Sequence, residues 1–224
     1  MIWESASNLP EIGGDQHILV IYGTAKATDL GSWTEWLTID EIEHAKRIRS
    51  EEERNTWISC HATLRQLLGN WLHLKPAEIE LKKSTLGKLY LSGSNLYFNL
   101  SHTAKSYLLG FNFNGRIGVD LEFLSGSEDL PLLIGYAFSW QETDFCNQGN
   151  KPENFLKIWT LKEAYLKATG VGLVDYLKSV NIYGGEDNAI DNKQLGQNCF
   201  TCPNGETASI VYRNEKPIDY IWLK

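Results

Sequence analysis

The chain has 224 residues, of which 42% are hydrophobic, with 8 Trp, 10 Tyr and 8 Phe. That apolar content is enough to bury a core, and it excludes a disordered chain. The net charge is −7. This charge excludes a general nucleic-acid binder, because such proteins need a basic surface to neutralise phosphates. We therefore expect no nucleic-acid partner.

Neither a membrane span nor a targeting segment is visible. No apolar run approaches the roughly 20 residues that span a bilayer, and the start, Met1-Ile2-Trp3-Glu4, lacks the pattern of a signal peptide. We expect a cytoplasmic protein with no membrane partner. Cys199 and Cys202 form a CxxC motif with no second pair nearby, which favours reduced thiols over a zinc site.

The first part of the chain reads as one strand, a helical region and several short strands. The apolar run 17–22 predicts an early buried strand. Residues 40–74 predict a helix in one or two pieces, with an apolar stripe at spacings of four and three. That stripe consists of Trp57, His61, Leu64, Leu68 and Trp71. Further strands are predicted at 79–81, 89–91, 97–100, 107–111 and 116–123. Residues 112–115 predict a hairpin between the last two of these strands.

The second part reads as helices followed by a β-rich end. A helix is expected after the loop at 126–129. Residues 154–169 predict a second helix, which the glycines at 170 and 172 end. Strands are predicted at 180–183, 207–213 and 220–223. This order of elements is consistent with two similar halves that meet near residue 112.

The predicted strand Ile117-Gly118-Val119-Asp120-Leu121-Glu122-Phe123 carries two carboxylates on one face. Side chains alternate along a strand, so Asp120 and Glu122 point one way and the apolar residues point the other. Neighbouring carboxylates repel each other unless a positive charge lies between them. A hard cation with oxygen ligands, magnesium or calcium rather than zinc, meets that need. The alternative is an exposed strand face with two solvated acids.

The helix predicted at 154–169 contains a further carboxylate among lysines. Glu163 lies opposite the core stripe of this helix, with Lys167 one turn later and Lys162 about 100° to one flank. Trp159 shares the side of Glu163, so we expect the helix to be covered on two sides. A carboxylate and lysines under such a cover indicate a site. The alternative is an ordinary Glu163–Lys167 pair on a helix surface, which stabilises by about 0.2–0.5 kcal/mol.

Four segments, in this order, resemble the motifs of the 4′-phosphopantetheinyl transferase superfamily. They are Phe98-Asn99-Leu100-Ser101-His102-Thr103, Gly118-Val119-Asp120-Leu121-Glu122, Phe138-Ser139-Trp140-Gln141-Glu142, and Trp159-Thr160-Leu161-Lys162-Glu163-Ala164-Tyr165-Leu166-Lys167 with Gly170-Val171-Gly172-Leu173 after it. The matched order and gaps extend over residues 87 to 173. The long first half, with Arg47, Arg54 and Arg65, is similar to the larger surfactin-synthetase-activating type. It does not resemble the short, trimeric holo-acyl-carrier-protein synthases.

This resemblance implies an α+β fold with a pseudo-twofold arrangement of two similar halves. Each half would be a small antiparallel sheet packed with a long helix. Residues 1–112 would form the half that contacts coenzyme A, and residues 113–224 the half with the metal site and the signature helix. We expect the protein to be a monomer.

The resemblance also implies a reaction. A serine hydroxyl of an apo acyl carrier or peptidyl carrier domain attacks the pyrophosphate of coenzyme A. The 4′-phosphopantetheine arm moves to the serine, and adenosine 3′,5′-bisphosphate leaves. Magnesium, with manganese as an alternative ion, and lysines would neutralise the charge of the pyrophosphate.

Roles for individual residues follow from the resemblance. The expected metal ligands are Asp120, Glu122 and Glu163. Glu163 either completes the metal shell or takes the serine proton, and the sequence leaves both roles open. The catalytic candidates are Asp120, Glu163 and Lys167. The candidates for coenzyme A binding are Arg54, Lys88, Ser101, His102, Lys162 and Lys167, of which the last two would hold the pyrophosphate. For His102 taken alone, a structural histidine is the alternative.

Two positions and two other functions stay open. Gly87-Lys88-Leu89 stands where the family often has Gly-Lys-Pro, which leaves the placement of Lys88 open. Glu142 matches the third motif, but a helix-capping carboxylate explains it equally well. The chain could bind coenzyme A or a carrier without transfer, or be another magnesium-dependent nucleotide enzyme. The second of these is weakened because neither GxxxxGK[ST] nor GxGxxG is present. Carrier proteins are acidic, as this chain is, so we expect docking through a local apolar patch with weak salt dependence.

Overall fold

The computed structural model describes residues 4–6, 17–25, 33–113, 115–126, 129–171, 177–182, 195–213 and 216–223. Its helices are α2 (Ile39–Arg47), α3 (Glu51–Leu72), α4 (Leu130–Ala137), α5 (Trp140–Asn147) and α6 (Lys151–Thr169), with the short 3-10 helices η2 (Thr34–Trp36) and η3 (Pro76–Glu78). Its strands are β1 (Glu4–Ala6), β2 (Ile18–Thr24), β3 (Leu81–Lys83), β4 (Leu89–Leu91), β5 (Leu96–His102), β6 (Ser106–Phe113), β7 (Ile117–Glu122), β8 (Leu195–Thr201), β9 (Thr207–Arg213) and β10 (Ile218–Leu223).

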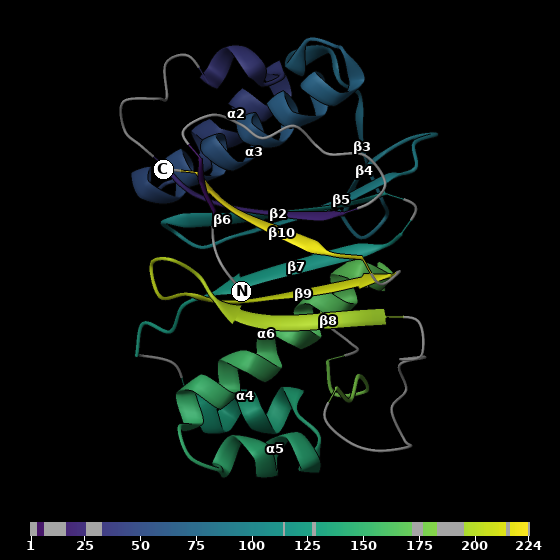
Figure 1. Ribbon diagram of the computed structural model, residues 1–224. Helices are drawn as coiled ribbons and strands as arrows, with labels where there is room; N and C mark the ends of the chain where they lie inside the picture. Colours follow the sequence, from purple (N-terminus) through teal and green to yellow (C-terminus); the bar gives the residue numbers. More distant parts are fainter. Residues whose placement is uncertain are drawn as a thin grey trace.

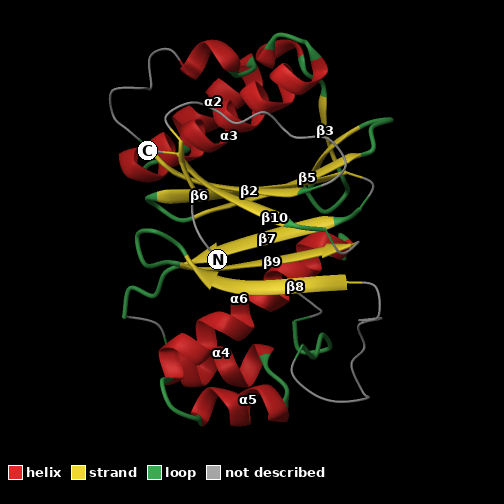
Figure 2. Cartoon of the chain, viewed as in Figure 1, coloured by secondary structure: helices red, strands yellow, loops and turns green. Residues whose placement is uncertain are grey.

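The described residues form an α+β fold in which helices cover the outer faces of two stacked sheets. The first sheet has the order β1-β10-β2-β6-β5, and the second has the order β7-β9-β8. Figure 1 shows α2 and α3 above the first sheet and α6 below the second, with α4 and α5 beyond α6. Figure 2 shows the same alternation of helix and strand layers. A separate hairpin, β3-β4, lies at one side.

The period of two along each strand divides the core between these layers. On β2, Leu19 and Ile21 pack with the buried face of α3, whereas Ile18 and Val20 belong to a cluster between the two sheets. From the second sheet that cluster receives Ile117, Val119, Leu121, Ala208 and Ile210. The apolar face predicted for 117–123 is therefore confirmed for these β7 residues, and it leaves Asp120 and Glu122 on the face toward α6.

Local sequence signals determine where the helices begin and end. The Thr38 side chain accepts a hydrogen bond from the Glu41 nitrogen, and the Glu41 carboxylate accepts one from the Thr38 nitrogen, so α2 begins with a capping box. Ser50 caps α3, ahead of an acidic first turn. The long signature helix, α6, ends at Gly170, whose φ of 74° is readily adopted only by glycine.

Most predicted elements are confirmed, with some corrections. The helical region 40–74 is two helices, α2 and α3, and the strands at 89–91, 97–100, 107–111 and 207–213 are present. The hairpin at 112–115 is wrong, because β6 pairs within the first sheet and β7 pairs with β9 in the second. Residue 114 lies outside the described residues. Residues 180–182 form no strand, and residue 183 is not described. The sequence did not predict β8.

The sheets also correct the expectation of one antiparallel sheet in each half. The first sheet is mixed, because β10 pairs parallel to both β1 and β2. The last strand therefore joins strands from the start of the chain, as the yellow β10 beside β2 shows in Figure 1. The division at residue 112 and the pseudo-twofold relation stay predictions. Among the described residues, no helix is both long and apolar enough to cross a bilayer.

Candidate functional site

The site begins where α6 crosses β7 with almost no space between the two backbones. A Cβ added at Gly118 would meet the Ala164 carbonyl oxygen and the Ala168 nitrogen closer than real Cβ atoms come to any neighbour. Both obstacles are backbone atoms of α6, so they cannot turn aside. Only glycine allows this approach. The crossing brings the acidic face of β7 directly against α6.

At this crossing Asp120 is the centre of a hydrogen-bonded cluster. Its Oδ1 accepts hydrogen bonds from Lys167 Nζ at 2.6 Å and from Ser101 Oγ at 3.0 Å. Lys167 Nζ also donates to Ser101 Oγ at 3.1 Å and lies 3.8 Å from Glu163 Oε2. The structure therefore brings together Ser101 from β5, Asp120 from β7, and Glu163 and Lys167 from α6. We call these four residues with Glu122 the acidic cluster.

The acidic cluster contains more negative than positive charge. Burial, followed by the charge of Asp120, raises the pKa of Glu163 to about 7. Burial and the charges of Asp120 and Glu163 raise the pKa of Glu122, also to about 7. Burial alone would lower the pKa of Lys167, but Asp120 and Glu163 outweigh it and hold that pKa above its ordinary value. Within the acidic cluster, the positive charge of Lys167 thus stands against three carboxyl groups. A further cation would be stabilised among them.

The acidic cluster matches magnesium in its chemistry. The Asp120 side chain is 1% exposed, and its second oxygen, Oδ2, is buried without a hydrogen-bond partner. A buried carboxylate oxygen left in this state is costly unless a ligand satisfies it. Carboxylate oxygens are the donors that magnesium prefers. Within the described ranges, however, no three His, Cys, Asp or Glu side chains already converge on one ion position, so the carboxylates would have to turn toward a metal.

A pocket of about 280 Å³ lies beside the acidic cluster and shares Lys167 with it. Its walls come from the β3–β4 hairpin, from β5 and from the end of α6. They consist of Lys83, Leu86, Gly87, Lys88, Leu89, Phe98, Asn99, Leu100, Leu166, Lys167 and Gly170. Three lysines on otherwise mostly apolar walls suit a ligand with both anionic and apolar parts.

Lys88 ties the hairpin wall of the pocket to the crossing of β7 and α6. Its Nζ donates to the Ile117 carbonyl at 2.9 Å and to the Lys167 carbonyl at 2.5 Å. The Lys167 carbonyl lies in the last turn of α6, where carbonyl groups have no hydrogen-bond partner within the helix. Burial, with a smaller effect of the Arg116 charge, lowers the pKa of Lys88 to about 8. Two of the three Nζ protons are used, which leaves one for a ligand.

The other candidates for coenzyme A binding lie outside the pocket wall. His102 follows Ser101 with an exposed side chain, and desolvation of its ring, followed by the Lys167 charge, lowers the pKa of His102. Arg54 is half-buried in the first turns of α3, and its guanidinium donates to the Ile48 carbonyl at 3.3 Å. Neither residue lines the pocket. Their roles toward coenzyme A stay predictions.

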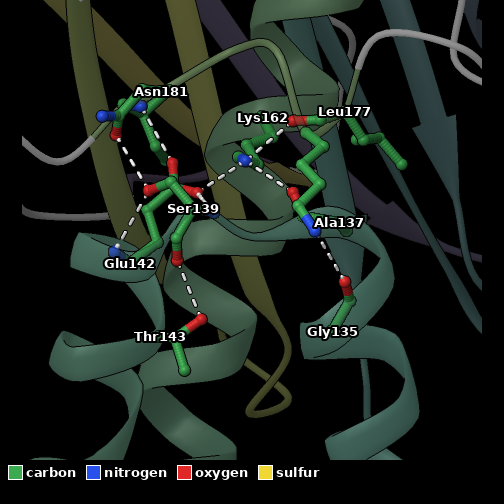
Figure 3. Close-up of polar contacts among 10 residues, drawn as sticks. Gly135, Ala137, Ser139, Glu142, Thr143, Lys162, Leu177 and Asn181 are labelled. Atoms are coloured by element: carbon green, nitrogen blue, oxygen red, sulfur yellow. Dashed lines mark hydrogen bonds and ion pairs between the residues drawn. The ribbon is translucent and has the colours of Figure 1, made fainter. Parts of the chain in front are cut away.

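The role predicted for Lys162 is wrong. Its side chain is 0% exposed and pairs with Glu142 at 2.6 Å, on the side of α6 that faces α4 and α5 (Figure 3). A pyrophosphate cannot reach a fully buried amine. Glu142 has the capping role that the sequence left open, because it forms a capping box with Ser139 at the start of α5.

Sequence reasoning missed Asn99, which joins the two sheets at the site together with Ser101. Asn99 Oδ1 accepts a hydrogen bond from the Val119 nitrogen at 2.8 Å, between β5 and β7. This bond holds the strand of Ser101 beside the strand of Asp120. The available signal was the position of Asn99 within the first motif, two residues before Ser101. The lining residues Lys83 and Leu86 had no signal in the sequence.

Comparison with known proteins gives a consistent result. The sequence profile of the 4′-phosphopantetheinyl transferase superfamily matches residues 116–216. The 4′-phosphopantetheinyl transferase HetI of Nostoc sp. is 32% identical over 173 residues, which cover 74% of this chain and 73% of that protein. The 4′-phosphopantetheinyl transferase ffp of Bacillus subtilis is 25% identical over 162 residues, 69% of this chain and 70% of that protein.

Proposed function

The chain belongs to the 4′-phosphopantetheinyl transferase superfamily, and we propose that it transfers the 4′-phosphopantetheine group of coenzyme A to a serine of an apo acyl carrier or peptidyl carrier domain. The observation behind this proposal is the acidic cluster beside a lysine-lined pocket. A pyrophosphate needs cations at its oxygens, and an attacking hydroxyl needs a nearby base. The cluster and the pocket offer both.

In the proposed reaction the serine oxygen forms a new bond to the phosphorus that carries the pantetheine arm. The bond from that phosphorus to the bridging oxygen of the pyrophosphate breaks. Adenosine 3′,5′-bisphosphate leaves with that oxygen, and the serine proton passes to a base. Reactions of this kind depend mainly on positioning and on stabilising charge.

We propose that Asp120, Glu122 and Glu163 hold the magnesium ion, which neutralises pyrophosphate charge when bound. Ser101 positions the Asp120 carboxylate through its hydrogen bond to Oδ1. Lys167 lies between the cluster and the pocket, so its ammonium can donate to a phosphate oxygen. Lys83 and Lys88 supply further positive charge from the hairpin wall.

The second role proposed for Glu163 is that of the base. A carboxylate with a pKa of about 7 accepts a proton at neutral pH far better than an ordinary one. The variant Glu163→Gln separates the two roles. Loss of magnesium affinity, measured by calorimetry, assigns it to the metal. Unchanged magnesium affinity with a turnover lowered by roughly 10²–10⁴-fold assigns it to proton transfer.

The proposed partner is a carrier domain that docks through apolar contacts on a monomeric enzyme. Leu86 lines the pocket and is 58% exposed, and Val171, beside the lining residue Gly170, is 43% exposed. A carrier domain that presents its serine to the pocket would contact these side chains. Because such contacts are uncharged, carrier affinity should change little with salt.

A mass-shift assay on a panel of apo carriers tests the proposal. Wild-type protein, coenzyme A and magnesium should add the mass of one phosphopantetheine arm to at least one carrier. Asp120→Ala should slow the transfer by about 10²-fold or more, because the residue central to the cluster is lost. Absence of transfer to every carrier, or an unchanged rate in Asp120→Ala, contradicts the proposal. Coenzyme A binding without any product would instead favour a binding protein.

A further inference from the structure

The ion pair between Glu142 and Lys162 is buried at both ends and fully bonded. Lys162 Nζ donates to Glu142 Oε2 at 2.6 Å, to the Ala137 carbonyl at 2.7 Å and to the Leu177 carbonyl at 2.7 Å. An ammonium has three N–H donors, so none is left over. The neighbouring Phe138 ring lies 5.4 Å from the same nitrogen. Lys162 therefore cannot contact substrate, despite its place in the family motif.

Glu142 holds its surroundings in the same way. Its Oε2 also accepts from the Ser139 nitrogen at 2.7 Å, and its Oε1 accepts from the Ile182 nitrogen at 2.9 Å. The pair thus connects α6 to the end of α4, the start of α5 and both ends of the segment 177–182 (Figure 3). We call Glu142 and Lys162 with these bonds the brace.

The brace differs from the apolar contacts that α6 makes with its neighbouring layers. Against the second sheet, α6 presents the small residues Ala164 and Ala168. Against α4 and α5 it presents apolar side chains such as Phe155 and Ile158. Apolar contacts stabilise without direction, so they tolerate small rotations of a helix. In the described part of the chain, the brace is the directional contact between α6 and α5 that joins two charges. An uncharged one lies nearer the start of α6, where the Asn154 side chain donates to the Phe145 carbonyl at 3.1 Å.

A buried ion pair rarely adds stability beyond what apolar side chains of the same size would give. Both side chains of the brace are 0% exposed, so their charges have lost all contact with water. Stability alone therefore does not account for the pair. The pair instead fixes the orientation of the Lys162 side chain, and Lys162 directly precedes Glu163 in α6.

We propose that the brace is a positioning device that sets the rotation of α6, and hence the direction of Glu163. Lys167, one turn later, is held separately by its bonds to Asp120 and Ser101. This inference rests on the proposed transfer reaction, because it assigns the brace a role in that reaction through Glu163. Lys162 is a positioning residue, one step removed from the substrate. The brace also holds the segment 177–182 against α6, a role independent of any reaction.

The test compares three variants with wild type. Lys162→Met removes one charge and leaves Glu142 buried without its cation. Lys162→Met/Glu142→Gln removes both charges and keeps an acceptor for the Ser139 or Ile182 nitrogen. Lys157→Met is the control, because its ion pair with Glu153, at 2.7 Å on the same helix, is about half exposed. Each variant is measured for Tm, for kcat, for KM of coenzyme A, and for exchange of the Ile182 amide hydrogen.

The single variant should lower Tm by about 10 °C, because one charge stays buried and unpaired. The double variant should recover at least half of that loss. Its kcat should nevertheless stay about 10-fold or more below wild type with KM of coenzyme A unchanged, because Glu163 is no longer held in position. Its Ile182 amide should exchange faster than in wild type. The control should match wild type in all four measurements.

Three results would overturn the inference. If kcat of the double variant recovers along with Tm, the pair is only structural. If KM of coenzyme A rises while kcat is unchanged, Lys162 acts on the ligand after all. If the Ile182 amide exchanges as in wild type, the brace holds nothing in place. This last result needs no transferase activity, so it remains decisive even if wild-type protein transfers nothing and the proposed function fails.

Discussion

The closest contact of the site, between Gly118 and α6, gives the sharpest prediction. In Gly118→Ala the new methyl group would press on the Ala164 carbonyl and the Ala168 nitrogen, so α6 has to move away from β7. Overpacking typically destabilises by about 1–3 kcal/mol. Because both obstacles are backbone atoms within one helix, we expect the upper end, about 3 kcal/mol. For a protein of this size, that lowers Tm by about 6–12 °C.

The same displacement should reduce activity. Lys167 Nζ lies 2.6 Å from Asp120 Oδ1 only because α6 sits directly on β7. A misplacement of about 1 Å between catalytic groups lowers the rate by roughly 10²-fold. We therefore expect Gly118→Ala to lower kcat/KM for carrier modification by at least that factor, measured at a temperature where the variant is fully folded.

Gly135→Ala is the matched control. Gly135 lies in α4, and a Cβ there would meet no atom within 4 Å. Alanine favours the helix over glycine by up to about 1 kcal/mol, so this variant should melt slightly above wild type with unchanged activity. Two results would refute the reasoning on Gly118. One is a Tm of Gly118→Ala within 1 °C of wild type, and the other is a lower Tm with full activity.

Three further predictions concern the pocket, the metal and pH. Lys88→Met should lower Tm and raise KM of coenzyme A by about 10-fold or more, because the pocket wall loses two bonds and a positive charge; an unchanged KM would place coenzyme A elsewhere. Removing divalent metal with EDTA should abolish transfer in the mass-shift assay, and added magnesium or manganese should restore it; transfer in EDTA would exclude the metal. Burial lowers the pKa of His61 to about 4, against about 6.5 in the unfolded chain. As pH falls from 6.5 to 4, the unfolded state therefore binds a proton at His61 that the folded state does not bind, which lowers the free energy of unfolding. Between pH 7 and pH 4.5, wild type should lose about 2–3 kcal/mol of stability that His61→Phe does not lose. Urea unfolding of both proteins at these two pH values measures the difference.

The arrangement of β7 could be predicted from the sequence because its signal has a period of two. The alternation of Val119 and Leu121 with Asp120 and Glu122 leaves one face for the core and one for the acids, and the structure has both faces. The partner of β7 could not be predicted in this way. The residues at 112–115 suit a hairpin, but β6 and β7 belong to different sheets, since β6 already has β2 and β5 as neighbours and β7 pairs with β9. A local turn signal contains no information on which edge is already paired.

The first sheet shows a second limit of local patterns. The apolar stretch at the end of the chain predicts a strand, and β10 is that strand. Its partner is β2, about 200 residues earlier in the chain, in parallel register, with Ile218 opposite Ile18. Alternation of apolar residues fixes which face of a strand is buried, but not which other strand it pairs with. From the order of elements alone, we expected the strands of the C-terminal half to pair with one another. Instead, β10 pairs with β1 and β2 from the start of the chain.

The signature helix shows why neighbouring residues were predicted unequally well. Lys162 and Glu163 lie about 100° apart on α6. A helical wheel places Glu163 and Lys167 on the side away from the core stripe, with Lys162 on one flank. What the wheel lacks is the identity of the layers on each side. Glu163 and Lys167 face β7, whereas Lys162 faces α4 and α5, where Glu142 supplies its counter-charge. Glu142 is 20 residues away in sequence, and the residues around Glu142 and Lys162 contain no pattern that predicts the pair. In this chain the motif therefore contains two kinds of residue, those that face the acidic cluster and one that pairs with α5. Only the three-dimensional packing distinguishes them.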